Sequence, residues 1–208
     1  MKIPRTATVV IAGVTALLWL IIAVLGTTDR AAVLMGFIPA RISGEIDLSP
    51  AVPALLTPLS STLVHGGLLH VAFNLLMLVW CGSAVERVLG RNALLLLYLV
   101  GAYVAAAAQF AVDPSSIIPM IGASGAISAV IGAFALSFGQ SKRIVRSAGL
   151  NRLLNALWLL AAWVVMQLMI GFVAGTQGSL LATPAHIGGF LVGLVLQRPL
   201  LLWRYRGA

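Results

Sequence analysis

Long apolar runs separated by short polar gaps make up most of this chain. The hydrocarbon core of a bilayer is about 30 Å thick, which a helix crosses in about 20 residues. Six runs approach that length, and they cover residues 7–26, 68–85, 92–112, 124–140, 153–174 and 184–203. The pattern predicts an all-α membrane protein with a bundle of six transmembrane helices. The first run is longer than the apolar part of a signal peptide, so we expect a retained span.

Composition supports the membrane class. Of the 208 residues, 61% are hydrophobic and only 9% are charged, whereas a soluble domain needs more polar surface. The net charge of +8 does not indicate nucleic-acid binding, because the basic residues lie in the gaps between apolar runs rather than on one solvated face. The single cysteine, Cys81, excludes an intramolecular disulfide and a multi-cysteine metal site. We expect it to pack between helices, and we expect no cofactor and no metal.

The basic residues also predict the orientation. With six spans, two of them, Arg30 and Arg41, fall on one side of the membrane. The other side carries Lys2, Arg5, Arg87, Arg91, Lys142, Arg143, Arg146, Arg152, Arg198, Arg204 and Arg206. By the positive-inside rule this side is cytoplasmic, and both termini lie there. Glu86 sits among these arginines, and we predict an interfacial ion pair with Arg87 or Arg91.

One membrane domain is expected to fill residues 1–208, since no repeat or low-complexity linker divides the chain. The first loop, residues 27–67, is long and apolar and contains four prolines. We expect part of it to lie on or in the outer membrane interface.

Four polar residues converge at the outer side of this topology. Ser124 opens the fourth span, and His186 lies in the first turn of the sixth. His70 and Asn74, four residues apart, share one face of the second span. Each of these residues also has an ordinary structural explanation. The serine could bond its own backbone, a histidine could be a packing residue, and the asparagine could join two helices by a hydrogen bond. Independent packing choices would scatter across both leaflets, so the shared depth favours a site.

The fourth span is short, which predicts that Ser124 lies below the membrane surface. Seventeen residues give roughly 25 Å at 1.5 Å per residue, less than the roughly 30 Å core. The preceding stretch, 113–123, must then enter the membrane as non-helical backbone, which needs protein cover or a water-filled cavity. Small residues share one face of each span with the candidate site residues: Ser124, Ser128 and Gly132 lie on one face of the fourth, and Gly189 and Gly193 lie on the face of His186 in the sixth. If these faces pack, Ser124 meets His186.

A serine hydroxyl becomes a nucleophile when a neighbouring base takes its proton, and histidine is the usual base. No carboxylate lies in the outer half of any span to orient that base, so we infer a Ser124–His186 dyad. Candidates for the oxyanion donors are the Ser124 backbone N–H, at a helix N-terminus, with the side chains of His70 and Asn74. The "GASGA" stretch departs from the G-x-S-x-G elbow of soluble hydrolases at Ala126, and no strand precedes it.

These motifs resemble the rhomboid intramembrane serine proteases. The resemblance rests on "GASG" with Ser124, "AHIGGFLVG" with His186, "HGGLLHVAFN" with His65, His70 and Asn74, and "GSAVERVLGRNALLLLY" between the second and third spans. It covers roughly residues 54 to 197, with the motifs in the family's order.

The resemblance implies a six-helix bundle with a cavity open to the outside and the Ser124–His186 dyad. It also implies an oxyanion site of His70, Asn74 and the Ser124 amide, with Gly122 shaping the loop. Substrates would be single-span membrane proteins, cut near the outer boundary after entering from the lipid between spans two and five. By family analogy the location is a bacterial plasma membrane. The sequence does not indicate the substrate or the oligomeric state.

Two departures from the family pattern bear on function. Many members carry an aromatic residue one turn after the nucleophile, stacked on the catalytic histidine, where this chain has Ser128. A Trp-Arg pair common in the first loop of bacterial members is absent from this sequence. They motivate one alternative, a catalytically silent relative that binds membrane-protein clients, although such relatives typically lose the serine or histidine. A transporter or channel is the other alternative, but the inner halves of the spans hold few polar residues.

Overall fold

A computed structural model describes residues 6–139, 145–173 and 182–207, and in these segments helices are the regular secondary structure, with no strand among them. An isolated antiparallel backbone pairing joins Phe37 to Met120. The α-helices are α1 (Ala7–Val24), α2 (Thr28–Met35), α3 (Pro39–Ile42), α4 (Thr57–Ser60), α5 (Leu68–Met77), α6 (Ser83–Leu89), α7 (Arg91–Val112), α8 (Ser124–Phe138), α9 (Ala148–Val173) and α10 (Thr183–Arg204). Short 3-10 helices flank α4 as η1 (Ala54–Leu56) and η2 (Ser61–Leu63), and a π-helical turn, η3 (Leu78–Gly82), joins α5 to α6.

Five helical segments are long and apolar enough to cross a membrane, counted over the described residues: Ala7–Val24, Leu68–Leu89, Arg91–Val112, Ala148–Met166 and Thr183–Arg204. The segment predicted as the fourth span is a shorter apolar helix, α8, of 15 residues. Each of the six apolar runs therefore contains a helix, and the chain is an all-helical, multi-pass membrane protein. The fifth run begins earlier than expected, at Ala148 rather than at residue 153. Its predicted end, residue 174, lies outside the described residues.

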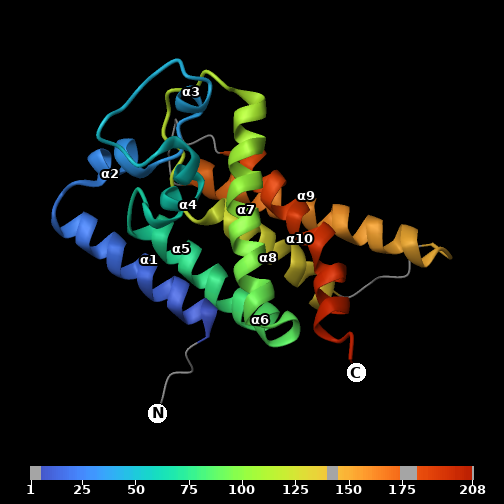
Figure 1. The fold of residues 1–208 in the computed structure, drawn as a ribbon. Helices are drawn as coiled ribbons and strands as arrows, with labels where there is room; N and C mark the ends of the chain where they lie inside the picture. Colours follow the sequence, from blue (N-terminus) through green and yellow to red (C-terminus); the bar gives the residue numbers. More distant parts are fainter. Residues whose placement is uncertain (1–5, 140–144, 174–181, 208) are drawn as a thin grey trace, which may run out of the picture.

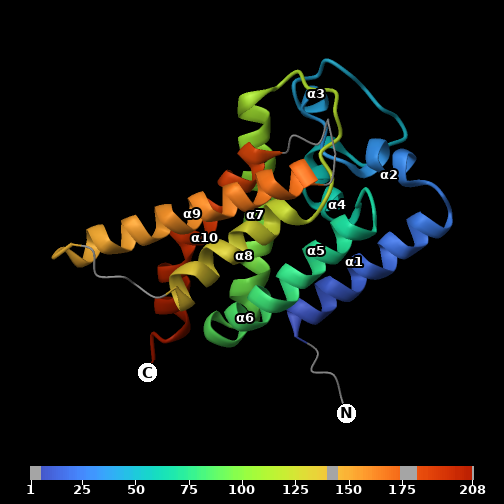
Figure 2. The same ribbon diagram turned by 180° about the vertical axis from the view of Figure 1, so that it is seen from behind.

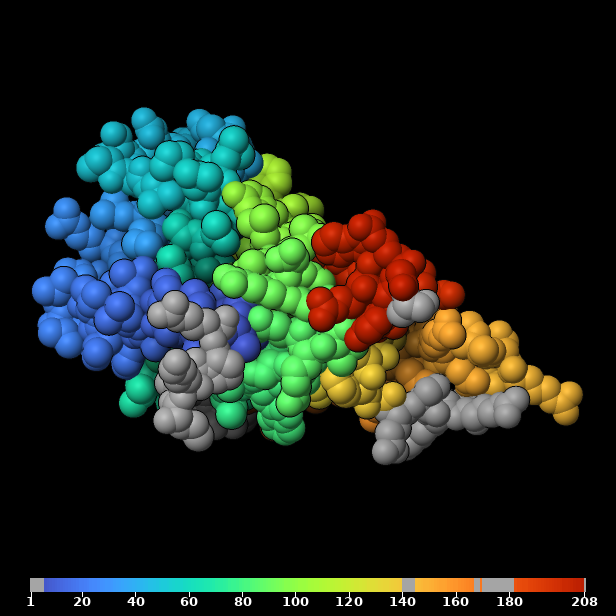
Figure 3. All heavy atoms as spheres, turned by 60° about the horizontal axis from the view of Figure 1, so that its bottom comes forward, coloured from blue at the N-terminus to red at the C-terminus, as the bar shows by residue number. Residues whose placement is uncertain are grey.

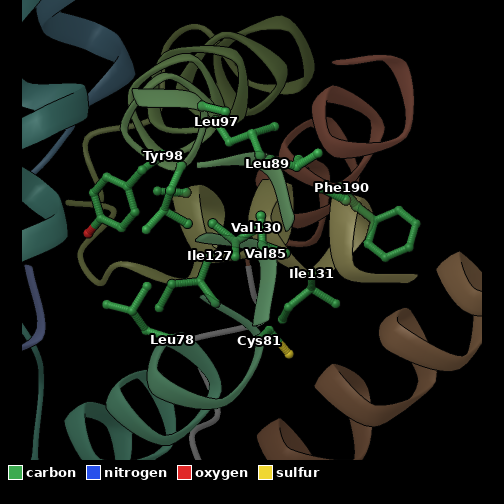
Figure 4. Close-up of a cluster of buried hydrophobic side chains, with 14 of the residues drawn as sticks. Leu78, Cys81, Val85, Leu89, Leu97, Tyr98, Ile127, Val130, Ile131 and Phe190 are labelled. Atoms are coloured by element: carbon green, nitrogen blue, oxygen red, sulfur yellow. The ribbon is translucent and has the colours of Figure 1, made fainter. Parts of the chain in front are cut away.

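The bundle is organised around α7, α8 and α10 (Figure 1). Helix α1 runs beside α5 on one flank, while α9 leaves the bundle on the opposite flank and extends past its neighbours (Figure 2). A space-filling view shows the start of α9 as a narrow projection from the molecule (Figure 3). Figure 4 shows the core, where side chains from the α5–α6 segment, α7, α8 and α10 meet, including Leu78, Cys81, Leu97, Ile127 and Phe190. Cys81 is buried there as a packing residue, as expected.

Helices α8 and α10 approach each other closely because glycines line their contact. A Cβ atom added at Gly189 would collide with the backbone carbonyl of Gly125, and one at Gly193 with that of Ala129. On α8, a Cβ at Gly132 would collide with the carbonyl of Phe190. The small-residue faces predicted from the sequence therefore do pack against each other, and they bring the first turns of the two helices together.

The first loop folds over the segment that leads into α8. Phe37 and Met120 exchange backbone hydrogen bonds of 3.0 and 2.8 Å, and the Ala40 N–H donates to the carbonyl of Ser116 at 3.0 Å. Residues 113–123 are non-helical, as the length of α8 led us to expect. Arg41 ties the loop to itself by donating to the carbonyl of Val52 at 2.9 Å.

The structure gives Glu86 closer partners than the ion pair predicted for it. Within the described residues, no direct ion-pair contact joins its carboxylate to Arg87 or Arg91, although the charge of Arg91 interacts with it favourably. The carboxylate accepts hydrogen bonds from the N–H groups of Ala7 and Thr8, at 2.7 and 2.9 Å, and from the Thr8 hydroxyl at 2.7 Å. These are orphan donors of the first turn of α1, so the carboxylate caps that helix from another span. Sequence spacing pointed to nearby arginines because a partner on a distant helix leaves no local signal.

Candidate active site

Ser124 and His186 meet where α8 and α10 begin. Ser124 is the first residue of α8, and its Oγ lies 2.7 Å from Nε2 of His186, in the first turn of α10. Ser124 is half-buried, and His186 is 6% exposed. Nδ1 of His186 is buried without a hydrogen-bond partner in the described structure. When Nε2 accepts the serine proton, Nδ1 carries the imidazole's other hydrogen. No carboxylate among the described residues accepts that hydrogen and orients the ring.

The backbone just before Ser124 is held by the segment around η2. The Gly122 N–H donates to the carbonyl of Ser61 at 2.9 Å, and the Ala123 N–H points at Nε2 of His65 at 3.4 Å. Those two amides are therefore occupied. The N–H of Ser124 begins α8 and has no acceptor within the helix, so it remains available at the positive end of the helix dipole.

Gly122 gives the loop its shape. Its φ of +109° is a conformation that side chains disfavour, and a Cβ there would lie 2.6 Å from Nε2 of His70. The absence of a side chain thus allows the His70 ring to approach the Ser124 loop. The Gly66 N–H points at Nδ1 of His70 at 3.4 Å, which makes Nδ1 an acceptor and places the hydrogen of the neutral ring on Nε2, the side facing Gly122.

Asn74 lies one turn further along α5 and is 4% exposed. Its Nδ2 donates to the carbonyl of His70 at 2.9 Å, which leaves one of its two amide hydrogens for another acceptor. The structure thus brings Ser124, His186, Gly122 and His70 together directly, whereas the side chain of Asn74 bonds the backbone carbonyl of His70.

A cavity of about 20 Å³ lies beside the Ser124–His186 pair, enough for about one water molecule. Its lining includes Ser124, Gly122 and His186, with small or hydroxyl side chains from α7, η2 and α10, namely Ala102, Ala105, Ser61, Thr62 and Ala185. No group of three potential metal-ligating side chains is gathered here or elsewhere in the described parts of the chain.

His65 has a position that the sequence alone did not define. It is 1% exposed, its ring meets that of His70 edge-on at 4.9 Å between centroids, and it faces the Ala123 amide. It precedes the second span, and burial together with the neighbouring His70 lowers the pKa of its imidazole to about 3. His65 is therefore a neutral hydrogen-bond acceptor for the loop. The "HGGLLH" motif singled it out, but only the fold reveals its partner.

Together the fold and this pair define a multi-pass helical membrane protein with a partly buried serine–histidine pair at the start of a short apolar helix. The Rhomboid domain family matches residues 54–203. The chain is 34% identical over 140 residues to the rhomboid protease GluP of Bacillus subtilis, an alignment that covers 67% of this chain and 24% of GluP. This protein belongs to the rhomboid family.

Other relatives are as distant. Rhomboid-related protein 2 of Mus musculus is 29% identical over 137 residues, covering 65% of this chain and 45% of that protein. The rhomboid protease GlpG of Haemophilus influenzae is 28% identical over 137 residues, covering 66% of this chain and 65% of that protein. The chain thus spans less than two thirds of the length of each of these relatives.

Proposed function

We propose that this protein is an intramembrane serine protease that cleaves transmembrane segments of single-span membrane proteins through a Ser124–His186 dyad. The observation that carries the proposal is the 2.7 Å contact between the serine Oγ and the imidazole Nε2, which is the geometry a base needs to activate a hydroxyl. Membership of a family with members named as proteases supports it.

The proposed reaction has two steps. His186 Nε2 takes the Ser124 hydroxyl proton as Oγ attacks the scissile carbonyl carbon, and the resulting imidazolium returns that proton to the leaving amine. An acyl-enzyme on Ser124 remains. Water then attacks the ester, with His186 again as base, and releases the carboxylic acid and the free serine.

Both steps pass through an oxyanion that requires hydrogen-bond donors. We assign the Ser124 N–H and the Nε2–H of His70 as donors, with the remaining amide hydrogen of Asn74 as a third. Gly122 allows the His70 ring and the Ser124 loop to lie at the required separation. Losing one such donor typically costs about 2.7–4 kcal/mol of transition-state stabilisation.

We further propose that α8 is the fourth of six spans in one membrane domain. Its 15 residues extend roughly 22 Å, so Ser124 would lie below the outer surface of a bilayer core roughly 30 Å thick. Cleavage would then fall near the outer boundary of a plasma membrane, here taken as bacterial, with both termini in the cytoplasm. Substrates would reach the site from the lipid.

Covalent labelling with a fluorophosphonate tests the dyad without knowledge of a substrate. Purified protein in detergent and in liposomes is expected to label at Ser124. Ser124→Ala is expected to abolish labelling, and His186→Ala to slow it by about 10³-fold or more. Ser137→Ala is the matched control, because Ser137 lies near the other end of α8 and bonds the carbonyl of Ala133. Folded wild-type protein that fails to label in both environments would refute the protease and favour a silent, client-binding relative.

A further inference from the structure

A buried chain of two hydrogen bonds connects α9 to the residue that carries the proposed nucleophile. The indole Nε1–H of Trp163, on α9, donates to Oγ of Ser128 at 3.0 Å, and the Ser128 hydroxyl donates to the carbonyl of Ser124 at 2.7 Å. Ser128 is fully buried and Trp163 is 5% exposed. Neither side chain has a part in the reaction proposed above.

The direction of this chain is fixed by the donors available. An indole nitrogen only donates, so Ser128 must accept from Trp163 and give its single proton to Ser124. Each bond polarises the next, which strengthens the contact with the Ser124 carbonyl. Without the indole, the serine hydroxyl keeps one bond to its own helix but loses the link that fixes its orientation.

Ser128 also occupies the junction between the helices of the pair. A Cβ added at Gly189, one turn after His186, would lie 3.2 Å from the Ser128 Cβ, so α8 and α10 are in contact at this level. Within the described residues, no aromatic ring forms a ring contact with His186. One turn after the nucleophile, where many family members carry an aromatic residue, this chain has the small hydroxyl side chain of Ser128, which contacts α9.

Helix α9 exposes much of its surface, with Trp158 72% and Val165 57% exposed. The side chains of this helix described as buried are Asn151, Ala156 and Trp163, and the last two lie seven residues apart on the face turned toward the bundle. A shift of α9 relative to α8 would thus change the geometry of the Trp163–Ser128 hydrogen bond.

We propose that Trp163 is a positioning residue that acts through Ser128 to hold the first turn of α8, and with it Ser124, in line with His186. The inference rests on the proposed serine-protease function. It assigns to α9 a part in the geometry of the dyad.

Trp163→Phe tests the proposal because it retains an aromatic ring and removes the indole donor. The probe is the fluorophosphonate, and its concentration dependence separates the maximal inactivation rate from the half-saturating concentration. We expect the maximal rate to fall about tenfold, with the half-saturating concentration unchanged and every molecule eventually labelled. Full final labelling shows that the variant is folded. Trp158→Phe, a matched change on the exposed face of the same helix, should label at the wild-type rate.

Ser128→Ala and the double variant complete the test. Ser128→Ala should slow labelling at least as much as Trp163→Phe, and adding Trp163→Phe to it should cause no further loss, because both changes act on one chain of bonds. A Trp163→Phe rate at or above wild type, equal losses in the Trp158 and Trp163 variants, or independent effects in the double variant would each overturn the positioning role. Wild-type protein that does not label at all would overturn the proposed function itself, which is a distinguishable result.

Discussion

The two residues just before Ser124 are held by neutral contacts with the segment before α5. Ser61 accepts from the Gly122 amide through its carbonyl, and the buried ring of His65 faces the Ala123 amide. Such an arrangement needs His65 to stay neutral, because a protonated imidazole has no acceptor left. The ring therefore links the stability of the loop to pH.

The sign of that link follows from the pKa. Burial and the nearby His70 lower the pKa of His65 from 6.5 to about 3. Between these pH values the unfolded chain binds a proton at His65 that the folded protein does not bind. The contribution of His65 to stability is complete above pH 6.5 and declines as pH falls toward 3. Between pH 6.5 and 5 we expect it to lower the free energy of unfolding by about 2 kcal/mol.

The measurement is thermal unfolding in detergent across this pH range, with His65→Gln as the comparison. Glutamine offers the Ala123 amide a carbonyl acceptor that does not titrate. The variant should show a shallower loss of stability on acidification, because every other group is the same in both proteins. If wild type and variant lose thermal stability in parallel as the pH falls, His65 is not the cause of the pH dependence.

The first turn of α1 is capped by a carboxylate from another helix. The Glu86 side chain accepts from two backbone amides and one hydroxyl in the first turn of α1. A negative charge at this end also complements the helix dipole. The α1–α6 contact is thus specified by hydrogen bonds as well as by packing.

Glu86→Gln should therefore destabilise the protein, because the amide supplies one acceptor oxygen and no charge. We expect a loss of about 1–2 kcal/mol, the range for a helix cap, measured by denaturant unfolding in detergent micelles. Glu45→Gln is the control, since Glu45 is exposed and its hydrogen bonds join loop residues. Equal losses from the two substitutions would contradict the capping role.

Which elements form was largely predictable from the sequence, and how they join was not. Apolar length located a helix in each of the six runs, and the small residues of α8 and α10 predicted their contact. The capping by Glu86 and the Trp163–Ser128 bond escaped prediction because each joins residues far apart in the chain. His65 escaped for the same reason: its partner, the Ala123 amide, lies 58 positions away.

Both ends of the described chain lie at one end of the bundle (Figure 1). The start of α1 meets Glu86. At the end of α10, the Tyr205 hydroxyl donates to the carbonyl of Val88, in the last turn of α6, at 3.2 Å. A Cβ on Gly90 would lie 2.6 Å from an Arg204 guanidinium nitrogen. The first loop and the Ser124 loop lie at the other end.

Cysteine labelling tests the sidedness that the basic residues predict. The native Cys81 is 4% exposed and should give little background. Asp47→Cys, in the first loop, should react with a membrane-impermeant maleimide on intact cells. Gly207→Cys, near the C-terminus, should react only after the membrane is opened, because both termini are predicted to be cytoplasmic. If Gly207→Cys reacts on intact cells and Asp47→Cys reacts only after the membrane is opened, the orientation is the opposite of the predicted one.

The cap on α1 bears on how far this protein can be truncated and still fold. The family match begins at residue 54, which leaves α1 and residues 27–53 of the first loop outside it, yet Glu86 inside the match is bonded to Ala7 and Thr8. A fragment trimmed to the matched residues would strip that carboxylate of three donors and the Ser124 loop of its backbone partners at Phe37 and Ala40. The boundary drawn by sequence similarity thus cuts through bonds that the folded protein needs.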